Sequence, residues 1–159
     1  MSRRQPAARS LAQQAFALRG AFPHASATLT PTLLDWTGDL KPTALSRTYT
    51  VRVVYRPGRY PHVTVLKPTL ESRPGETLPH VFNDGSLCLH LEDDWTSNKL
   101  IVDTILPWAS EWLIHYELWK FTGTWHGGGE WPPARNPDVA TATAAMLSPS
   151  GTQAVLEPR

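Results

Sequence analysis

The chain has 159 residues, of which 41% are hydrophobic and 18% charged, and its formal net charge is +1 at pH 7. This length and composition fit one globular domain and argue against disorder, a fibrous repeat or an electrostatic nucleic-acid binder. No apolar run is long enough to cross a bilayer, and the single cysteine, Cys88, excludes an intrachain disulfide. We therefore expect a cytoplasmic protein without membrane or nucleic-acid partners. It should form one domain over residues 1–159, with a core at about 11–133 and a tail at 134–159 that holds a short helix at 137–147.

The first half of the chain is predicted to form one helix and a small antiparallel sheet. Residues 7–19 favour a short helix because their apolar positions share one face. Residues 27–36 are rich in threonine and leucine and contain Pro31, which suits an edge strand. Residues 47–55 alternate with the period of a strand, and residues 62–66 can run back beside them after a turn. The pattern predicts a meander of three strands.

The second half is predicted to contain a long connection, a tight turn and the main helical segment. Residues 66–79 hold three prolines and a glycine and should cross the surface. Asn83-Asp84-Gly85 is a strong turn signal between two short apolar pieces. Residues 100–121 carry a wide apolar face, within which Pro107 predicts either a kink or the start of a second helix. Gly123 is expected to end this segment.

Cys88 is the candidate nucleophile. It follows the predicted turn closely, where a side chain can be presented to solvent, and it lies between His80 and His90 in the sequence. Attack on an acyl carbon requires a thiolate, and a nearby imidazolium or loop N–H groups can lower the pKa of a thiol. The developing oxyanion needs a donor, for which His80 and backbone amides are candidates. We consider His90, Asp93 and Asp94 as supporting groups, since carboxylates can orient or deprotonate an incoming lysine.

Three alternatives use the same atoms. A lone cysteine is often a small buried hydrophobe with no chemical role. His80, Cys88 and His90 are also candidate metal ligands, although their spacing matches no familiar zinc site. A cysteine hydrolase would pair Cys88 with a distant imidazole, either His115 or His126.

Tryptophan is unusually frequent, and six of the seven tryptophans fall within residues 95–131. Those at helical spacing are expected in the core: Trp108, Trp112 and Trp119. Trp125 and Trp131 lie in a glycine- and proline-rich turn and are the better candidates for binding a partner.

Several spaced motifs resemble the ubiquitin-conjugating enzymes over residues 11–121. Tyr60-Pro61 looks like the Tyr-Pro at the start of that family's third strand. Residues 81–89, Val-Phe-Asn-Asp-Gly-Ser-Leu-Cys-Leu, are similar to its segment leading into the catalytic cysteine, and Trp95 resembles the tryptophan before its second helix. The resemblance implies an α+β fold with an N-terminal helix, an antiparallel meander sheet and C-terminal helices. It also makes Cys88 the thioester residue.

One departure from the family lies just before this segment. The His-Pro-Asn signature of the family corresponds here to Leu78-Pro79-His80. His80 thus occupies the position of an asparagine that is generally assigned to oxyanion stabilisation or to holding the active-site loop. A histidine N–H can donate a similar hydrogen bond, and its ring can also exchange a proton.

Two stretches in the C-terminal half resemble one particular group of ubiquitin-conjugating-like proteins. Residues 106–119 and 122–132 are similar to bacterial ubiquitin-conjugating-like proteins of antiphage cyclic-oligonucleotide signalling (CBASS) operons. The resemblance implies that Cys88 takes the C-terminus of a cGAS-like nucleotidyltransferase as an acyl group and conjugates it to a lysine of a target protein. We expect no cofactor. No phosphate-binding glycine loop follows a strand, so the acyl group should arrive already activated, by a separate activating enzyme or another partner.

A different class of function stays open beside this one. The chain would be a non-catalytic binding module that keeps the conjugating-enzyme fold, with its tryptophan-rich half as the interface. In that hypothesis His80 marks chemistry that has been lost.

Overall fold

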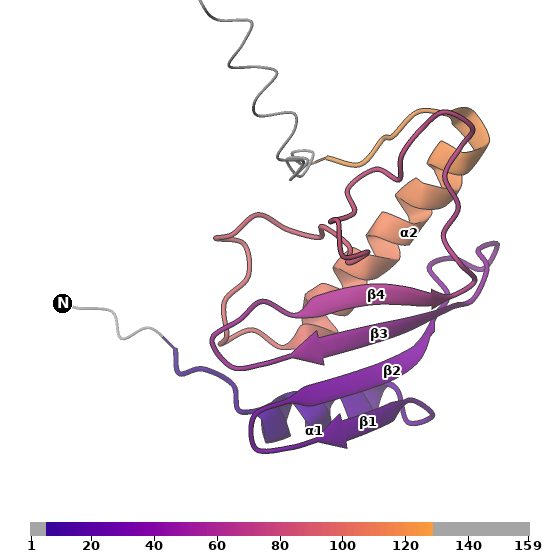
Figure 1. Cartoon of the computed structure of the whole chain (residues 1–159). Coiled ribbons are helices and arrows are strands. Elements are labelled where there is room, and N and C mark those ends of the chain that lie inside the picture. The colour runs from indigo at the N-terminus through magenta and orange to yellow at the C-terminus, as the bar shows by residue number, and fades with distance from the viewer. Residues whose placement is uncertain (1–5, 129–159) are drawn as a thin grey trace, which may run out of the picture.

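A four-stranded antiparallel sheet with a helix on either side of it in the sequence forms the frame of the molecule (Figure 1). The structure is a computed structural model that describes residues 6–128, so Trp131 and the predicted tail helix at 137–147 lie outside it. The elements are α1 (Leu11–Ala21), β1 (Ser26–Leu29), β2 (Leu34–Leu40), β3 (Tyr49–Tyr55), β4 (His62–Lys67), the 3₁₀ turn η1 (Ile101–Asp103) and α2 (Ile105–Thr122). The expected α+β architecture is confirmed.

Helix α1 begins later than predicted because Ser10 forms a capping box. The Ser10 side chain accepts a hydrogen bond from the Gln13 N–H at 3.1 Å, and the Gln13 side chain accepts from the Ser10 N–H at 2.9 Å. One turn on, the fully buried Gln14 amide donates to the Lys99 carbonyl at 2.8 Å and accepts from the Ile101 N–H at 2.9 Å. This amide joins α1 to the start of η1.

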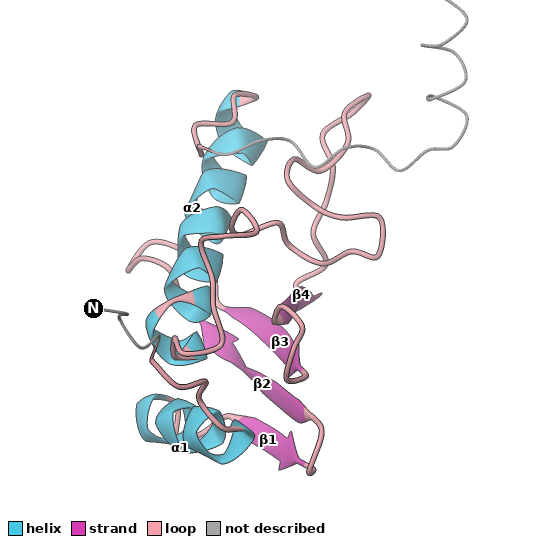
Figure 2. Cartoon of the chain, turned by 90° about the vertical axis from the view of Figure 1, so that its left-hand side faces the viewer, coloured by secondary structure: helices cyan, strands magenta, loops and turns pink. Residues whose placement is uncertain are grey.

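The sheet has the order β1-β2-β3-β4, and Figure 2 shows α1 beside β1 at one edge and β4 at the other. The prediction of one strand over residues 27–36 is wrong, because the chain turns at residues 30–33 and forms both β1 and β2. The Thr30 N–H donates to the Leu33 carbonyl at 2.9 Å across this turn, and Pro31, which lacks an N–H, lies inside it. The two later strands are confirmed, with bounds shifted by one or two residues.

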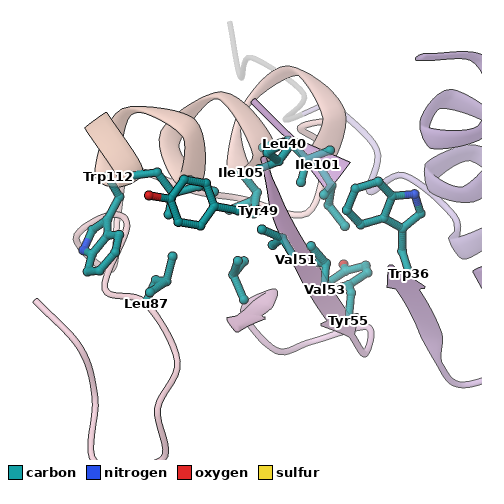
Figure 3. Packing of buried hydrophobic residues seen from close by; sticks show 14 of the residues in the cluster. Trp36, Leu40, Tyr49, Val51, Val53, Tyr55, Leu87, Ile101, Ile105 and Trp112 are labelled. Carbon is teal, nitrogen blue, oxygen red and sulfur yellow. The ribbon is translucent and has the colours of Figure 1, made fainter. Parts of the chain in front are cut away.

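The core lies between one face of the sheet and the segment η1–α2. Alternate residues of β2 and β3 point into it, and Trp36, Tyr49 and Tyr55 are almost fully buried there. Figure 3 shows these side chains facing Ile101 and Ile105, with Leu87 and Trp112 at the opposite end of the cluster from Trp36. The fully buried aliphatic side chains contribute about 1.5–3 kcal/mol each. Because Leu87 precedes Cys88, the core anchors the chain right beside the candidate nucleophile.

Helix α2 resolves the two options left by Pro107. The helical segment is divided, since η1 ends at Asp103 and α2 starts at Ile105. Pro107 lies in the first turn of α2, where its missing N–H has no intrahelical acceptor to lose. Gly123 ends the helix in the left-handed region with φ 81°, and its N–H donates to the Trp119 carbonyl at 2.8 Å. In residues 6–128, no helix is both long and apolar enough to span a membrane.

The long connection after β4 is fastened to the C-terminal end of α2, beside which it runs in Figure 1. Arg73 donates to the Lys120 carbonyl at 2.9 Å, so a cation satisfies one of the last carbonyls of the helix. The Trp119 indole N–H donates to the Glu76 carboxylate at 3.2 Å. These contacts fix the path of the chain as it approaches His80.

Candidate functional site

The predicted turn ahead of Cys88 is present. Val81 and Leu87 form an antiparallel bridge, and the Phe82 N–H donates to the Ser86 carbonyl at 2.8 Å. Gly85 has φ 83°, a conformation that favours glycine, and its N–H donates to the Phe82 carbonyl at 2.9 Å. The Asn-Asp-Gly sequence therefore folds as its residue types predict.

Asp84 stabilises this turn. One of its carboxylate oxygens accepts from the Ser86 hydroxyl at 2.6 Å and from the Ser86 N–H at 2.9 Å. The other lies 3.2 Å from Nε2 of His62 in β4. The Ser86 hydroxyl bond, and to a lesser degree the positive charge of a protonated His62, lower the pKa of Asp84. One oxygen of the Asp84 carboxylate thus stabilises the turn itself, and the other contacts β4 of the sheet.

The backbone around Cys88 is fixed by two hydrogen bonds. The Leu87 N–H donates to the Val63 carbonyl in β4 at 2.8 Å, and the Cys88 N–H donates to the His80 carbonyl at 2.9 Å. The Cys88 side chain is half-buried and lines an open groove of about 430 Å³. Burial raises the pKa of the Cys88 thiol, so the lowering that an imidazolium or loop N–H groups would cause is not what the structure shows. The side chain thus borders the groove, and its burial favours the protonated thiol over the thiolate.

His80 lies beside Cys88, as the sequence predicted for this pair. Its backbone is in the left-handed region with φ 50°, and its carbonyl accepts from both the Cys88 N–H and the Trp112 indole N–H, the latter at 3.2 Å. Its side chain is only 6% exposed and also lines the groove. The Trp125 ring stacks on the imidazole, with centroids 5.1 Å apart and planes 27° apart.

His90 forms part of the same groove, next to Cys88 and Leu89. Its Nδ1 is 2.7 Å from the Leu91 carbonyl oxygen, which can only accept, so Nδ1 carries the proton. The ring lies between Tyr60 and Trp108, at centroid distances of 5.3 and 5.6 Å. The hydrogen bond and the two aromatic neighbours fix both the tautomer and the position of this imidazole.

The acidic residues after His90 differ in their placement. Asp94 lines the groove, and its carboxylate accepts from the Leu91 N–H at 3.0 Å. Asp93 is exposed and is not among the lining residues. The structure therefore brings four of the predicted groups together, namely Cys88, His80, His90 and Asp94, and leaves Asp93 outside.

Helix α2 supplies a wall of the groove that the sequence analysis did not identify. Trp108, Glu111, Trp112 and His115 line it, at the i, i+3, i+4 and i+7 spacing of one helix face. Trp112 and Trp119 are buried as expected, whereas Trp108 is only half-buried because it faces the groove. The helical spacing was the available signal, but nothing in the sequence shows that this face meets Cys88.

The described residues bear on two alternative chemistries, a metal site and a cysteine hydrolase. Within residues 6–128 no group of three or more histidine, cysteine or acidic side chains is placed to hold a metal ion. His115 lines the groove, with Nε2 3.7 Å from the Glu111 carboxylate, whereas His126 is exposed and is not a lining residue. A hydrolase would therefore use His115 rather than His126.

A comparison with protein families gives one match. The family model described as Type II CBASS E2 protein matches residues 14–133, three quarters of the chain and the whole of the groove. No curated protein matches the chain.

Proposed function

Because this chain belongs to the family of Type II CBASS E2 proteins, which gives it an E2-like role in antiphage defence, we propose that Cys88 forms a thioester and passes the acyl group to an amine. The observation that carries this proposal is the position of Cys88. It is the only cysteine, hydrogen bonds fix its backbone and that of Leu87, and its half-buried side chain lines an open groove. A nucleophile needs these properties to meet an acyl carbon in a defined geometry.

Two successive acyl transfers make up the reaction. In the first, Cys88 Sγ, after losing its proton, attacks the carbonyl carbon of an activated acyl group, and the activating group leaves with the electron pair of the broken bond. In the second, an amine nitrogen attacks the thioester carbon, Cys88 leaves as a thiolate that is reprotonated, and the amine loses a proton as the amide forms.

His80 is the proposed oxyanion donor. Both steps pass through a tetrahedral centre whose oxygen carries negative charge, and a donor fixed beside that oxygen stabilises it. His80 shares the groove with Cys88 and is joined to it by the backbone hydrogen bond at 2.9 Å. Its buried, stacked ring is held in place before the substrate arrives.

The remaining groove residues support the amine step. Nδ1 of His90 is engaged with the Leu91 carbonyl, so Nε2 is the ring nitrogen left for the acceptor amine. Asp94 and Glu111 are the charged lining side chains, and no lysine or arginine lines the groove within the described part of the chain. A groove of this charge favours a cationic lysine side chain over an acidic one. We therefore propose a protein lysine as the acceptor and His90 and Asp94 as supporting groups, with Trp125 and Trp131 as candidates for contacts to a protein partner.

Membership of a CBASS family supports one class of acyl donor. We propose the C-terminus of a cGAS-like nucleotidyltransferase, activated before it reaches Cys88. A separate activating enzyme is the simplest source of that activation.

The test uses a synthetic peptide bearing a C-terminal mercaptoethanesulfonate thioester as donor and Nα-acetyl-lysine as acceptor. We expect a protein–peptide adduct that hydroxylamine and thiols remove, followed by amide product. Cys88→Ser should give a thiol-resistant ester or none, and Cys88→Ala none. Amide formation that persists in Cys88→Ala would overturn the proposal.

Two observations favour the binding module as a second candidate. The thiol has a raised pKa and the His80 ring is largely covered, both of which suit a protein that binds without reacting. Equal affinity of wild type and Cys88→Ser for the nucleotidyltransferase, with no thiol-sensitive adduct from the peptide thioester, would establish this function instead.

A further inference from the structure

The segment that follows α2 returns to the groove and places Trp125 in it. Gly123 ends the helix in the left-handed region, and two residues later the Trp125 ring meets three side chains. Its centroid is 5.1 Å from that of His80, 5.6 Å from that of Trp112 and 5.7 Å from that of His115. These contacts come from two separate parts of the chain, the segment that holds His80 and helix α2.

The contact with His80 differs in kind from the other two. Trp125 is tilted by 54° and 50° against Trp112 and His115, but its plane is only 27° from that of His80. Stacked rings restrict rotation of the imidazole, whereas tilted contacts mainly fill space. The His80 carbonyl is held by two hydrogen bonds, and the ring stack adds a contact on the side chain that restricts its torsions.

Gly127 shows that the chain is fitted closely around this ring. A Cβ atom at this position would lie 2.6 Å from Nε1 and 2.9 Å from Cε2 of Trp125, and 3.0 Å from Cδ2 of His115. The backbone of Gly127 does not need a positive φ, so the requirement is purely steric. Only a residue without a side chain lets the segment close over Trp125 in this position.

We propose that Trp125 is a positioning residue that acts through His80, by holding the imidazole in the orientation in which it stabilises the oxyanion at Cys88. This inference rests on the proposed function. A hydrogen-bond donor accelerates acyl transfer only when it is aimed at the developing charge. Loss of the Trp125 stack removes the contact on one face of the imidazole, so the ring spends less time in the productive orientation and stabilises the oxyanion less well.

A double-mutant cycle tests the proposal. The protein is loaded with the peptide thioester, and the rate of transfer to Nα-acetyl-lysine is measured in a single turnover for wild type, His80→Ala, Trp125→Ala and the double variant. We expect His80→Ala to be slower by roughly 10²-fold, the usual loss of one oxyanion donor, and Trp125→Ala to be slower by a smaller factor. The double variant should be no slower than His80→Ala, because Trp125 has nothing left to position. Losses that multiply in the double variant would overturn the proposal.

Two further variants separate positioning from folding. Trp125→Phe keeps a ring for stacking and should recover most of the rate. Gly127→Ala should reproduce the loss seen in Trp125→Ala, and it replaces that variant in the cycle if Trp125→Ala does not fold. Gly20→Ala is the matched control, since a Cβ there meets nothing within 4 Å. Normal transfer by Gly127→Ala would contradict the inference.

A measurement without catalysis keeps this inference distinct from the proposed function. The ring current of a stacked indole shifts the His80 imidazole protons upfield in the NMR spectrum, and this shift should disappear in Trp125→Ala and in Gly127→Ala. If the wild type shows the upfield shift but never forms a Cys88 adduct, only the proposed function is wrong. If the wild type transfers the acyl group normally and its His80 protons are unshifted, only the positioning role of Trp125 is wrong.

Discussion

The inner face of the sheet and the groove are both rich in aromatic rings, yet they are built differently. On the sheet, Trp36, Tyr49 and Tyr55 are almost fully buried and share a continuous apolar cluster. In the groove, His80 and His90 are each held by particular backbone and ring contacts and border open space. A change on the sheet should therefore lower the free energy of unfolding, whereas a change in the groove should lower the rate of acyl transfer.

Trp36→Ala gives the largest expected effect on the sheet side of this comparison. The Trp36 side chain is 1% exposed and meets Phe22 edge-on at 5.3 Å. Truncation of such a side chain leaves a cavity and should lower the free energy of unfolding by about 3–5 kcal/mol. Urea unfolding measures this loss, and Leu45→Ala, at a side chain that is 98% exposed, is the control with a change within about 0.5 kcal/mol.

The same variant tests whether the two regions are separate. The fraction of Trp36→Ala that remains folded should still load the peptide thioester at the wild-type rate. A loading defect per folded molecule would show that the sheet face and the groove are coupled.

Gln14→Ala should have the next largest effect. The Gln14 amide is fully buried and bonds to the Lys99 carbonyl and the Ile101 N–H, so its removal leaves both backbone groups without these partners. The expected loss is about 1–3 kcal/mol in the free energy of unfolding. Gln13→Ala, in which an exposed capping bond is lost, should cost less, and an equal loss in the two variants would contradict the bridging role of Gln14.

Folding should change the reactivity of the Cys88 thiol, and this change can be measured. Because burial raises the pKa of the thiol, the folded protein holds less thiolate than the unfolded chain at any pH below the raised pKa. Alkylation by iodoacetamide should therefore be slower in the folded protein at pH 7, and its rate should keep rising with pH beyond about 8.5, the ordinary pKa of a cysteine. Folded protein that reacts faster than protein in denaturant, with a plateau below pH 8, would show a lowered pKa instead.

The same shift has a consequence for stability with a definite sign. The folded state binds the thiol proton more tightly than the unfolded state, so the contribution of Cys88 is constant below the ordinary pKa of the thiol. It is lost as the pH rises through the raised pKa. Cys88→Ala should remove this part of the alkaline loss of stability.

Local sequence patterns account for much of the sheet and for the turn, and for less of the groove. Period-two alternation predicted β3, the turn that follows it predicted β4, and Asn83-Asp84-Gly85 predicted the turn before Cys88, because in each case the neighbours along the chain determine the conformation. The break between β1 and β2 was missed, since residues 27–36 read as one extended stretch apart from Pro31.

The unpredicted parts of the groove depend on contacts between distant segments. The stack of Trp125 on His80 joins residues on either side of α2, and no periodicity in residues 124–128 signals it. The direction of the Cys88 pKa shift likewise depends on how much solvent the folded chain excludes, which the flanking histidines and acids in the sequence do not reveal.

Glu111→Gln gives the smallest expected effect and tests the groove side of the comparison most directly. The Glu111 side chain is 69% exposed, so its removal should leave the free energy of unfolding within about 0.5 kcal/mol of wild type. It also lines the groove beside Asp94, and the attraction that it exerts on a cationic acceptor is lost in the variant. Transfer to Nα-acetyl-lysine should slow by roughly threefold, in line with the few tenths to 1 kcal/mol of an exposed ion pair, and the deficit should shrink at high salt.

Asp103→Asn, an exposed acid that does not line the groove, is the matched control. A loss of the same size with a neutral amine such as hydroxylamine would show that Glu111 acts on the groove itself rather than on the charge of the acceptor.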